Sequence, residues 1–305
     1  MKKTMVLLFV ALSTCLCAST EKNHPDQVRI AAVQFPGLSH QSEQEFLATM
    51  GRYINEAEKK HVKILLFPEL LTLNLLKDPN HVTVPQYNKI VHFLGKYKQY
   101  LQSMAKSKEM IIIGGTTLTK KDNTFYNTAI IAFPNGDIKT VDKSLLTPWE
   151  LSHLITGIGQ SEPLSFETPW GRVVVLICYE AESPEIISKV SKINPNMIFI
   201  PSNTGGLFGL ERVSIAARFI ALSEVTYTLL TGVTTNIARE KITDQGVGQA
   251  IFALPKERGY PLKASLGTFN QPDMLVVDAD IKKIEQDKRS SQVTNAARDY
   301  LRQHH

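Results

Sequence analysis

The stretch GRVVVLICYEAESPE, residues 171–185, carries the clearest structural signal in the chain. Its five consecutive apolar residues, 173–177, are typical of a strand that is buried on both faces of a sheet. Cys178 follows directly, and Tyr179 and Glu180 begin the turn out of the sheet. In α/β folds, reactive side chains are presented where strands end. The stretch therefore predicts an α/β fold with a cysteine at the edge of its sheet.

Strand and helix patterns alternate on both sides of this stretch. Strands are predicted at residues 28–33, 63–67, 110–113, 173–178, 197–201 and 227–232, and helices at 41–60, 90–104, 183–192 and 211–224. Residues 125–133 and 138–142 flank the turn sequence Pro134-Asn135-Gly136 and predict a hairpin. The sequence has no internal repeat and no long linker. We therefore expect layered α/β architecture in a single domain.

Composition and charge narrow the range of partners. The 305 residues are 43% hydrophobic, 8% aromatic and 21% charged, and the formal net charge is +5. These values are ordinary for a globular protein, and a charge surplus this small gives no reason to expect nucleic acid as a partner. No basic run or cluster of aromatic residues suggests one either. We expect a small-molecule substrate instead.

The first nineteen residues have the pattern of a signal peptide. Lys2 and Lys3 precede an apolar run at residues 5–12, and small residues follow it. Cleavage after Ser19 would give a secreted or periplasmic protein, whereas a lipoprotein-like box at residues 12–15 would place a lipid anchor on Cys15. Threonine precedes that cysteine, which favours ordinary secretion. No later segment approaches eighteen apolar residues, so we expect no transmembrane segment in the mature chain.

The cysteine count makes Cys178 a distinctive residue. Cys15 and Cys17 lie in the predicted signal peptide, so cleavage leaves Cys178 alone and without a disulfide partner. A free thiol in an exported protein is open to oxidation. Cys178 is therefore either a buried core residue or a residue that is there to react.

Sequence patterns for metal and cofactor chemistry are missing. The eight histidines are His24, His40, His61, His81, His92, His153, His304 and His305. None has the spacing of a metal site, and the chain lacks dinucleotide-binding, P-loop and G-x-S-x-G motifs. A papain-like pair needs a histidine well after the cysteine, and only the last two follow Cys178. We expect neither a metal nor an organic cofactor.

Two charged residues join Cys178 at predicted strand ends. Glu69 follows residues 63–67 among apolar neighbours, which predicts a raised pKa suited to general acid–base work. Lys143 follows residues 138–142 and also has an apolar setting. Taken singly, Glu69 could start a helix and Lys143 could be a solvated lysine. Together, a carboxylate, an ammonium and a thiol are what attack on an amide or ester carbonyl requires.

At these residues the sequence resembles the nitrilase, or carbon–nitrogen hydrolase, superfamily. The resemblance covers residues 28–280 and includes VRIAAVQ, LLFPEL, IIIGGTT, YNTAIIAFPNGDI, VDKSLLTPWE and GRVVVLICYEAESPE. It implies a four-layer αββα sandwich, a homodimer, and Glu69, Lys143 and Cys178 as catalytic residues. Glu150 matches a second glutamate found near the lysine in many members, or it caps a helix. Residues 281–305 are left as a polar tail, either a surface helix or disordered.

Finer features leave several functions open. ICYE at 177–180, SNTGGLFG at 202–209 and TTN at 234–236 are similar to the soluble domain of apolipoprotein N-acyltransferase. Members of that group carry several membrane helices, which this sequence lacks. We therefore expect an exported amidase-type hydrolase that works through a thioester, with N-acyl transfer as the alternative. A catalytically inactive ligand-binding protein is the alternative from another class.

Roles around the predicted nucleophile follow from the same resemblance. Lys143 and the backbone N–H of Tyr179 are expected to hold the oxyanion of the reaction. Residues beside the motifs are candidates for lining the substrate pocket, or else they belong to the core. These residues are Tyr126, Trp149, Tyr179, Leu207 and Phe208.

Overall fold

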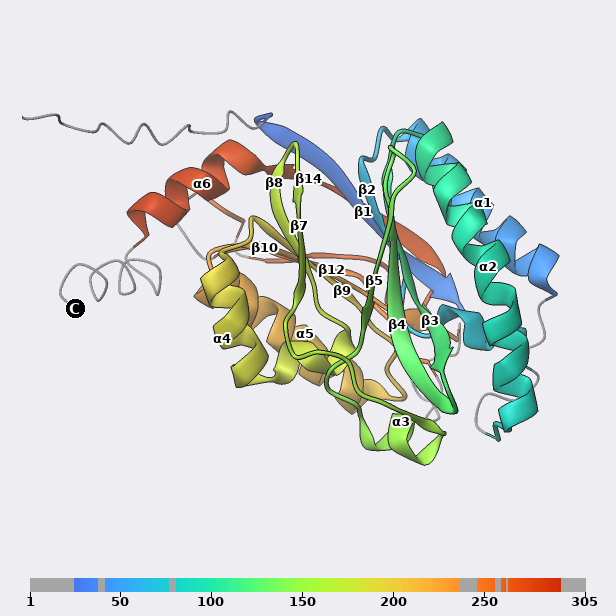
Figure 1. Ribbon diagram of the computed structural model, residues 1–305. Coiled ribbons are helices and arrows are strands. Elements are labelled where there is room, and N and C mark those ends of the chain that lie inside the picture. Colours follow the sequence, from blue (N-terminus) through green and yellow to red (C-terminus); the bar gives the residue numbers. More distant parts are fainter. Residues whose placement is uncertain are drawn as a thin grey trace, which may run out of the picture.

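Two β-sheets packed face to face form the centre of the protein, and helices cover the outer face of each (Figure 1). The structure is a computed structural model that describes residues 25–37, 42–76, 81–235, 246–255, 259–261 and 263–291. Within these residues the layers run helix, sheet, sheet, helix. The predicted four-layer αββα sandwich in one domain is confirmed.

The first sheet has eight strands, of which six form the path β11-β1-β2-β3-β4-β5. β14 pairs with β1, and β6 pairs with β4. Their bounds are β1 Gln27–Pro36, β2 Ile64–Leu66, β3 Ile111–Lys121, β4 Thr124–Ala132, β5 Ile138–Asp142, β6 Ile155–Gly157, β11 Val233–Thr234 and β14 Asp273–Asp280. β4 and β5 are antiparallel, so the predicted hairpin is present.

The second sheet has six strands in the order β13-β12-β10-β9-β8-β7. Their bounds are β7 Leu164–Thr168, β8 Gly171–Val175, β9 Met197–Pro201, β10 Tyr227–Thr231, β12 Ile251–Ala253 and β13 Ser265–Leu266. β8, β9 and β10 run parallel and are almost entirely buried. Buried parallel strands have continuous apolar sequences, which is why these three strands could be predicted from the sequence.

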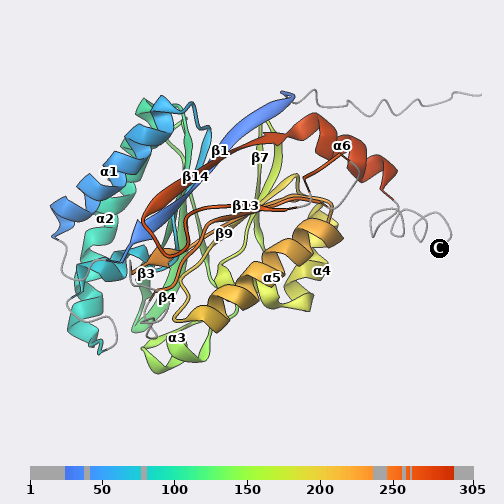
Figure 2. The same ribbon diagram turned by 180° about the vertical axis from the view of Figure 1, so that it is seen from behind.

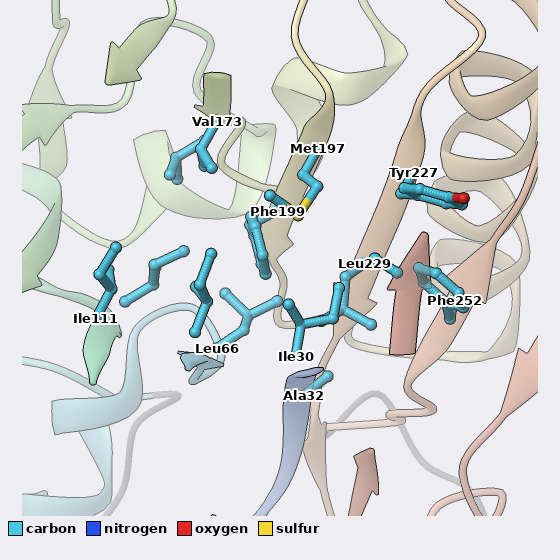
Figure 3. Packing of buried hydrophobic residues seen from close by; sticks show 14 of the residues in the cluster. Ile30, Ala32, Leu66, Ile111, Val173, Met197, Phe199, Tyr227, Leu229 and Phe252 are labelled. Atoms are coloured by element: carbon cyan, nitrogen blue, oxygen red, sulfur yellow. The ribbon is translucent and has the colours of Figure 1, made fainter. Parts of the chain in front are cut away.

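The core between the sheets is apolar and contains residues from both. Figure 3 shows Ile30, Leu66 and Ile111 of the first sheet opposite Val173 and Phe199 of the second. Burial of these side chains removes apolar surface from water, which is the dominant force that holds two sheets together. The packing fixes the ends of β2, β5, β8 and β9 relative to one another.

Helices cover the outer faces in pairs (Figure 2). α1 (Glu43–Lys59) and α2 (Val84–Ser107) pack on the first sheet, and α4 (Pro184–Ile193) and α5 (Leu207–Ser223) pack on the second. Ser42 and Thr83 begin α1 and α2 with capping boxes, which satisfy backbone N–H groups that a helix start leaves unpaired.

The chain beyond residue 280 begins with a helix, which was one of the two expectations for this segment. α6 (Ile281–Ser290) is a helix whose Ile281 and Ile284 are fully buried in the inter-sheet core. Two isoleucines one turn apart give the helix an apolar contact face although its other residues are charged or polar. The ordered fold therefore extends past the expected limit at residue 280.

Some sequence predictions fall outside the described residues. These are the signal peptide at residues 1–19, the lipid anchor at Cys15, Asn236, and residues 292–305 of the tail. Within the part of the chain that the structure describes, no helix is both long and apolar enough to cross a membrane.

Candidate active site

Glu69 lies just beyond β2, in a turn that is held by hydrogen bonds with other segments. Its backbone N–H donates to the carbonyl of Ser202 at 3.3 Å. Leu70 next to it has a φ of 49°, a left-handed backbone conformation that is uncommon for leucine. Its N–H donates to Thr116 Oγ1 at 2.7 Å. A strained backbone held by outside contacts is typical of functional sites.

Gly115 allows β3 to approach this turn. A Cβ at Gly115 would lie 1.9 Å from the carbonyl oxygen of Pro68, and Gly115 has a φ of 71°. The N–H of Thr116 donates to that same carbonyl at 3.2 Å. Only glycine combines this backbone conformation with so close an approach, so the IIIGGTT motif serves to hold the Glu69 turn.

Lys143 follows β5 and is anchored through its backbone. Its N–H donates to the carbonyl of Asn127 at 2.8 Å, and its carbonyl accepts from Gly159 N–H at 2.8 Å. The side chain is 1% exposed. Its Nζ donates to Glu69 Oε1 and to Glu150 Oε2, both at 2.7 Å. The structure thus places the predicted lysine in direct contact with the predicted base.

Cys178 lies beyond β8, at the start of the 3-10 helix η2 (Cys178–Glu182). The predicted strand over 173–178 ends earlier, because β8 stops at Val175 and Cys178 has a φ of 49°. This left-handed turn lifts the cysteine out of the strand path. Its Sγ accepts a hydrogen bond from Ser202 Oγ at 3.1 Å, and the residue is 7% exposed. Glu69 lies close enough for its charge to act on the Cys178 thiol, so the three predicted residues meet.

Glu150 caps a helix and also contacts Lys143. It lies in α3 (Pro148–Ser152), and it accepts from Thr147 N–H at 2.8 Å and from Thr147 Oγ1 at 2.9 Å in a capping box. The same carboxylate forms the ion pair with Lys143. A helix start therefore positions a second buried carboxylate on the lysine.

Asn127 is a site residue that the sequence analysis missed. Its Nδ2 donates to Glu69 Oε1 at 2.8 Å and to Glu150 Oε1 at 2.7 Å, and the residue is fully buried. Its amide thus bridges the two carboxylates that flank Lys143. The available signal was a polar residue inside the apolar strand pattern FYNTAIIA, since buried polar groups need partners.

Glu180 connects the lysine segment with the cysteine segment. One carboxylate oxygen accepts from the N–H and the Oγ of Ser144, both at 2.7 Å. The other accepts from Ile177 N–H at 2.7 Å. Because three donors satisfy a carboxylate that is 7% exposed, Glu180 fixes Lys143 and Cys178 relative to each other.

Burial and charge shift the pKa values of the three candidate residues. Burial raises the pKa of Glu69 as predicted, although Lys143 opposes the shift. Burial disfavours the charged form of Lys143, but Glu69 and Glu150 outweigh it and raise the lysine pKa. Burial and the charge of Glu69 raise the pKa of Cys178 to about 12. The resting site therefore holds a neutral thiol beside an ammonium and carboxylates.

The aromatic candidates for the substrate pocket differ in exposure and in their contacts. Trp149 is 36% exposed and stacks on His153, and Tyr126 packs under Lys121. The ring of Tyr179 lies against the guanidinium of Arg212. Leu207 is half-buried, and Phe208 is 88% exposed at the start of α5. Phe208 is thus not part of the core.

Candidate metal ligands do not gather in the described part of the chain. No group of three His, Cys, Asp or Glu side chains there has the arrangement to hold a metal ion. The carboxylates of Glu69 and Glu150 are instead bonded to Lys143 and Asn127.

Known proteins resemble this chain in sequence. A probable hydrolase of Bacillus subtilis, YhcX, is 24% identical over 83% of this chain and 50% of its own length. The 2-oxoglutaramate amidase of the same organism is 31% identical over 48% of this chain and 54% of its own length. The omega-amidase NIT3 of Saccharomyces cerevisiae is 25% identical over 72% and 78%. The chain thus spans about half the length of the first two relatives.

Solved structures share the fold. Nit3 of Saccharomyces cerevisiae, a member of branch 10 of the nitrilase superfamily, superimposes with a TM-score of 0.71 at 20% identity, over 89% of this chain and 96% of that one. An amidase from Nesterenkonia gives a TM-score of 0.66 at 17% identity, over 86% and 94%. The carbon-nitrogen hydrolase family model matches residues 29–256. The chain therefore belongs to the carbon-nitrogen hydrolase family.

Proposed function

We propose that the protein is an amidase-type hydrolase that cleaves a carbon–nitrogen bond other than a peptide bond, through a thioester on Cys178. The observation that carries this proposal is the buried contact of Lys143 with Glu69 at 2.7 Å, beside the Cys178 thiol. Family membership and the amidases among the relatives support it. A ligand-binding protein without activity would have no use for a buried thiol next to a base and an ammonium.

Attack begins with proton transfer from Cys178 to Glu69. Because the thiol pKa is about 12, the sulfur is protonated at neutral pH and needs a base as it attacks. Sulfur bonds to the carbonyl carbon and the carbonyl electrons move to oxygen. The Lys143 ammonium and the backbone N–H of Tyr179 stabilise that oxyanion. Glu69 then protonates the amide nitrogen, the carbon–nitrogen bond breaks, and ammonia or an amine leaves.

Water completes the cycle by hydrolysing the thioester. Glu69, again a carboxylate, takes a proton from water as the water oxygen attacks the thioester carbonyl. The carbon–sulfur bond breaks, the sulfur regains a proton from Glu69, and a carboxylic acid is released. If an amine takes the place of water, the same steps give N-acyl transfer, so the acceptor alone separates the two reactions.

The test is release of ammonia from a panel of small amides that includes propionamide, 2-oxoglutaramate and glutaramate. We expect hydrolysis of at least one by the wild type and none above background by Cys178→Ala. An added amine that discharges the acyl group faster than water would reassign the protein as an acyltransferase. Equal turnover by Cys178→Ala would refute the cysteine mechanism.

We also propose that residues 1–19 direct export and are removed. The charged start at Lys2 and Lys3 and the apolar run at residues 5–12 support this. Expression in a bacterial host, followed by intact mass measurement of the extracellular and periplasmic fractions, should give a chain that begins at Thr20. A lipid-modified Cys15 would show the alternative anchor, and an uncleaved chain in the cytoplasm would contradict export.

A homodimer through α5 is the assembly that we propose. Phe208, Ile215, Phe219 and Leu222 are exposed along this helix at intervals that place them on one face. An antiparallel copy centred on Ile215 would bring Phe208 opposite Leu222 and the exposed Glu211 near Arg218 of the second copy. Light scattering should give twice the monomer mass, and Phe219→Glu should halve it. A monomeric wild type would contradict this.

A further inference from the structure

Ser202 directly follows β9, whose parallel neighbour β8 leads to Cys178. The serine is 2% exposed and has the sequence setting Pro201-Ser202-Asn203. Since β8 and β9 end at the same edge of the sheet, residues just beyond them lie side by side. This arrangement places a buried hydroxyl next to the thiol, although nothing in the proposed function uses it.

The segment of Ser202 and Asn203 contacts both the thiol and the base. Ser202 Oγ donates to Cys178 Sγ at 3.1 Å, and the Ser202 carbonyl accepts from Glu69 N–H at 3.3 Å. The N–H of Asn203 donates to Glu69 Oε2 at 3.0 Å. One short turn after β9 therefore sets the distance between the nucleophile and the carboxylate that takes its proton.

We propose that Ser202 is a further catalytic residue, whose hydroxyl hydrogen-bonds the Cys178 sulfur and stabilises it whenever it carries negative charge. The inference deepens the proposed function and rests on it. A serine hydroxyl has one proton to donate, and here that proton points to the sulfur. The thiol's own proton is then left for Glu69.

The hydroxyl takes part in two steps without losing its proton. As Cys178 passes its proton to Glu69, the developing thiolate is a stronger acceptor than the thiol, so the hydrogen bond from Ser202 strengthens. When the sulfur bonds to carbon, its charge and the hydrogen bond weaken. When the thioester breaks, the sulfur again carries charge as it leaves, and the same hydrogen bond stabilises it.

The electrostatics of the site explain why such a donor is needed. Burial and the neighbouring Glu69 both disfavour a thiolate at Cys178, whereas Lys143, the Ser202 hydroxyl and the backbone N–H of Asn203 favour it. Lys143 already donates to two carboxylates, so its charge is shared between them and the Cys178 thiolate. Ser202 is the hydroxyl in the described residues that donates directly to Sγ. Its contribution is thus specific to the sulfur.

The test compares the rate at which iodoacetamide alkylates Cys178 in four proteins, read by mass spectrometry at pH 8. These are the wild type, Ser202→Ala, Ser202→Thr, which keeps a hydroxyl, and Ser214→Ala. Ser214 is a matched control because it is 5% exposed and its Oγ donates to the Leu210 carbonyl within α5. Thermal unfolding of each variant reports folding separately, and Ser202→Gly replaces Ser202→Ala if alanine prevents folding.

We expect Ser202→Ala to slow alkylation by about 10- to 100-fold, which is the effect of one hydrogen bond to a charged group. Ser202→Thr should recover most of the rate, and Ser214→Ala should match the wild type. An alkylation rate in folded Ser202→Ala within twofold of wild type would overturn the inference, as would equal slowing by Ser214→Ala. If the wild type alkylates and Ser202→Ala is slow but no amide is hydrolysed, the proposed function fails and the role of Ser202 toward the sulfur stands.

Discussion

Two lysine–glutamate pairs in this protein have nearly the same length and very different surroundings. Lys143 Nζ lies 2.7 Å from Glu69 with side chains 1% and 3% exposed, whereas Lys96 Nζ lies 2.8 Å from Glu43 with side chains 57% and 48% exposed. Water screens the surface pair, so its partners behave almost independently. In the buried cluster, removal of one partner leaves a charge without solvent or counter-charge.

The difference supports the proposed function, in which the buried cluster is an arrangement for chemistry rather than for stability. Two carboxylates share one ammonium, and each ion paid a desolvation cost on burial. The gain is a set of shifted pKa values, with a carboxyl that accepts a proton more readily and a lysine that keeps its charge. Four predictions test this contrast, in order from the largest expected effect to the smallest.

Lys143→Met should have the largest effect, because it leaves Glu69 and Glu150 buried without a cation. We expect a loss of about 3–5 kcal/mol in the free energy of unfolding, measured by urea denaturation. Amide hydrolysis should fall at least about 100-fold in the fraction that folds. The lost stability should return partly at low pH as the carboxylates take up protons. A stability equal to wild type at pH 8 would contradict the account.

Asn127→Leu should come next, because it removes two hydrogen bonds from the carboxylates but keeps the ion pairs. Loss of a partner from buried charged groups costs about 1–3 kcal/mol, so we expect the urea midpoint to fall by a corresponding amount. The pKa of Glu69 should rise further, and the acid limb of the activity profile should move to higher pH. An unshifted acid limb would show that Asn127 does not act on Glu69.

The pKa values of a buried carboxyl group and a surface carboxyl group should be shifted in opposite directions. Burial raises the pKa of Glu69, so the base is ionised only above its usual range, and kcat/KM should fall as the pH drops through that raised value. On the surface, the hydrogen bond from Arg29 lowers the pKa of Asp278. Its stabilising contribution is therefore present above the unfolded pKa and is lost as the pH falls through the folded one.

These directions can be checked by carboxyl carbon NMR on protein with Glu69→Gln and Asp278→Asn as assignment controls. We expect the signal that disappears in Glu69→Gln to titrate above the ordinary range for glutamate. The signal that disappears in Asp278→Asn should titrate below the ordinary range for aspartate. The same direction for both residues would contradict the contrast.

Lys96→Met should have the smallest effect. The Lys96–Glu43 pair is exposed, and pairs of this kind contribute less than about 1 kcal/mol. The urea midpoint should shift slightly at low salt and not at all at high salt, and activity should not change. A loss comparable with that of Lys143→Met would show that burial does not separate the two pairs.

Much of the fold was predictable because its signals are local. The apolar runs at residues 63–67, 173–177 and 197–201 fixed three buried strands, and Pro134-Asn135-Gly136 fixed a hairpin. Short strands such as β6, β11 and β13 were not predicted, since their pairing depends on distant partners rather than on their own residues.

The candidate site was predictable where a charged or thiol side chain directly follows a predicted strand. Glu69, Lys143 and Cys178 each have that signal, and the structure brings them together. Asn127 lies inside a strand and lacks it. Ser202 does follow the apolar strand at 197–201, but its role depends on β8 lying next to β9, which the sequence does not state. The exposure of Phe208 could not be predicted either, because a position beside a motif does not indicate which face of the helix the residue occupies.

The most direct test of the account is the mass of the protein during turnover of an amide that it hydrolyses. Acid quenching followed by peptide mapping should show the acyl group on Cys178, and the adduct should be absent in Cys178→Ala. Glu69→Gln should prevent its formation, because the thiol then has no base. Hydrolysis that proceeds with no adduct on Cys178, or that survives in Cys178→Ala, would contradict the account.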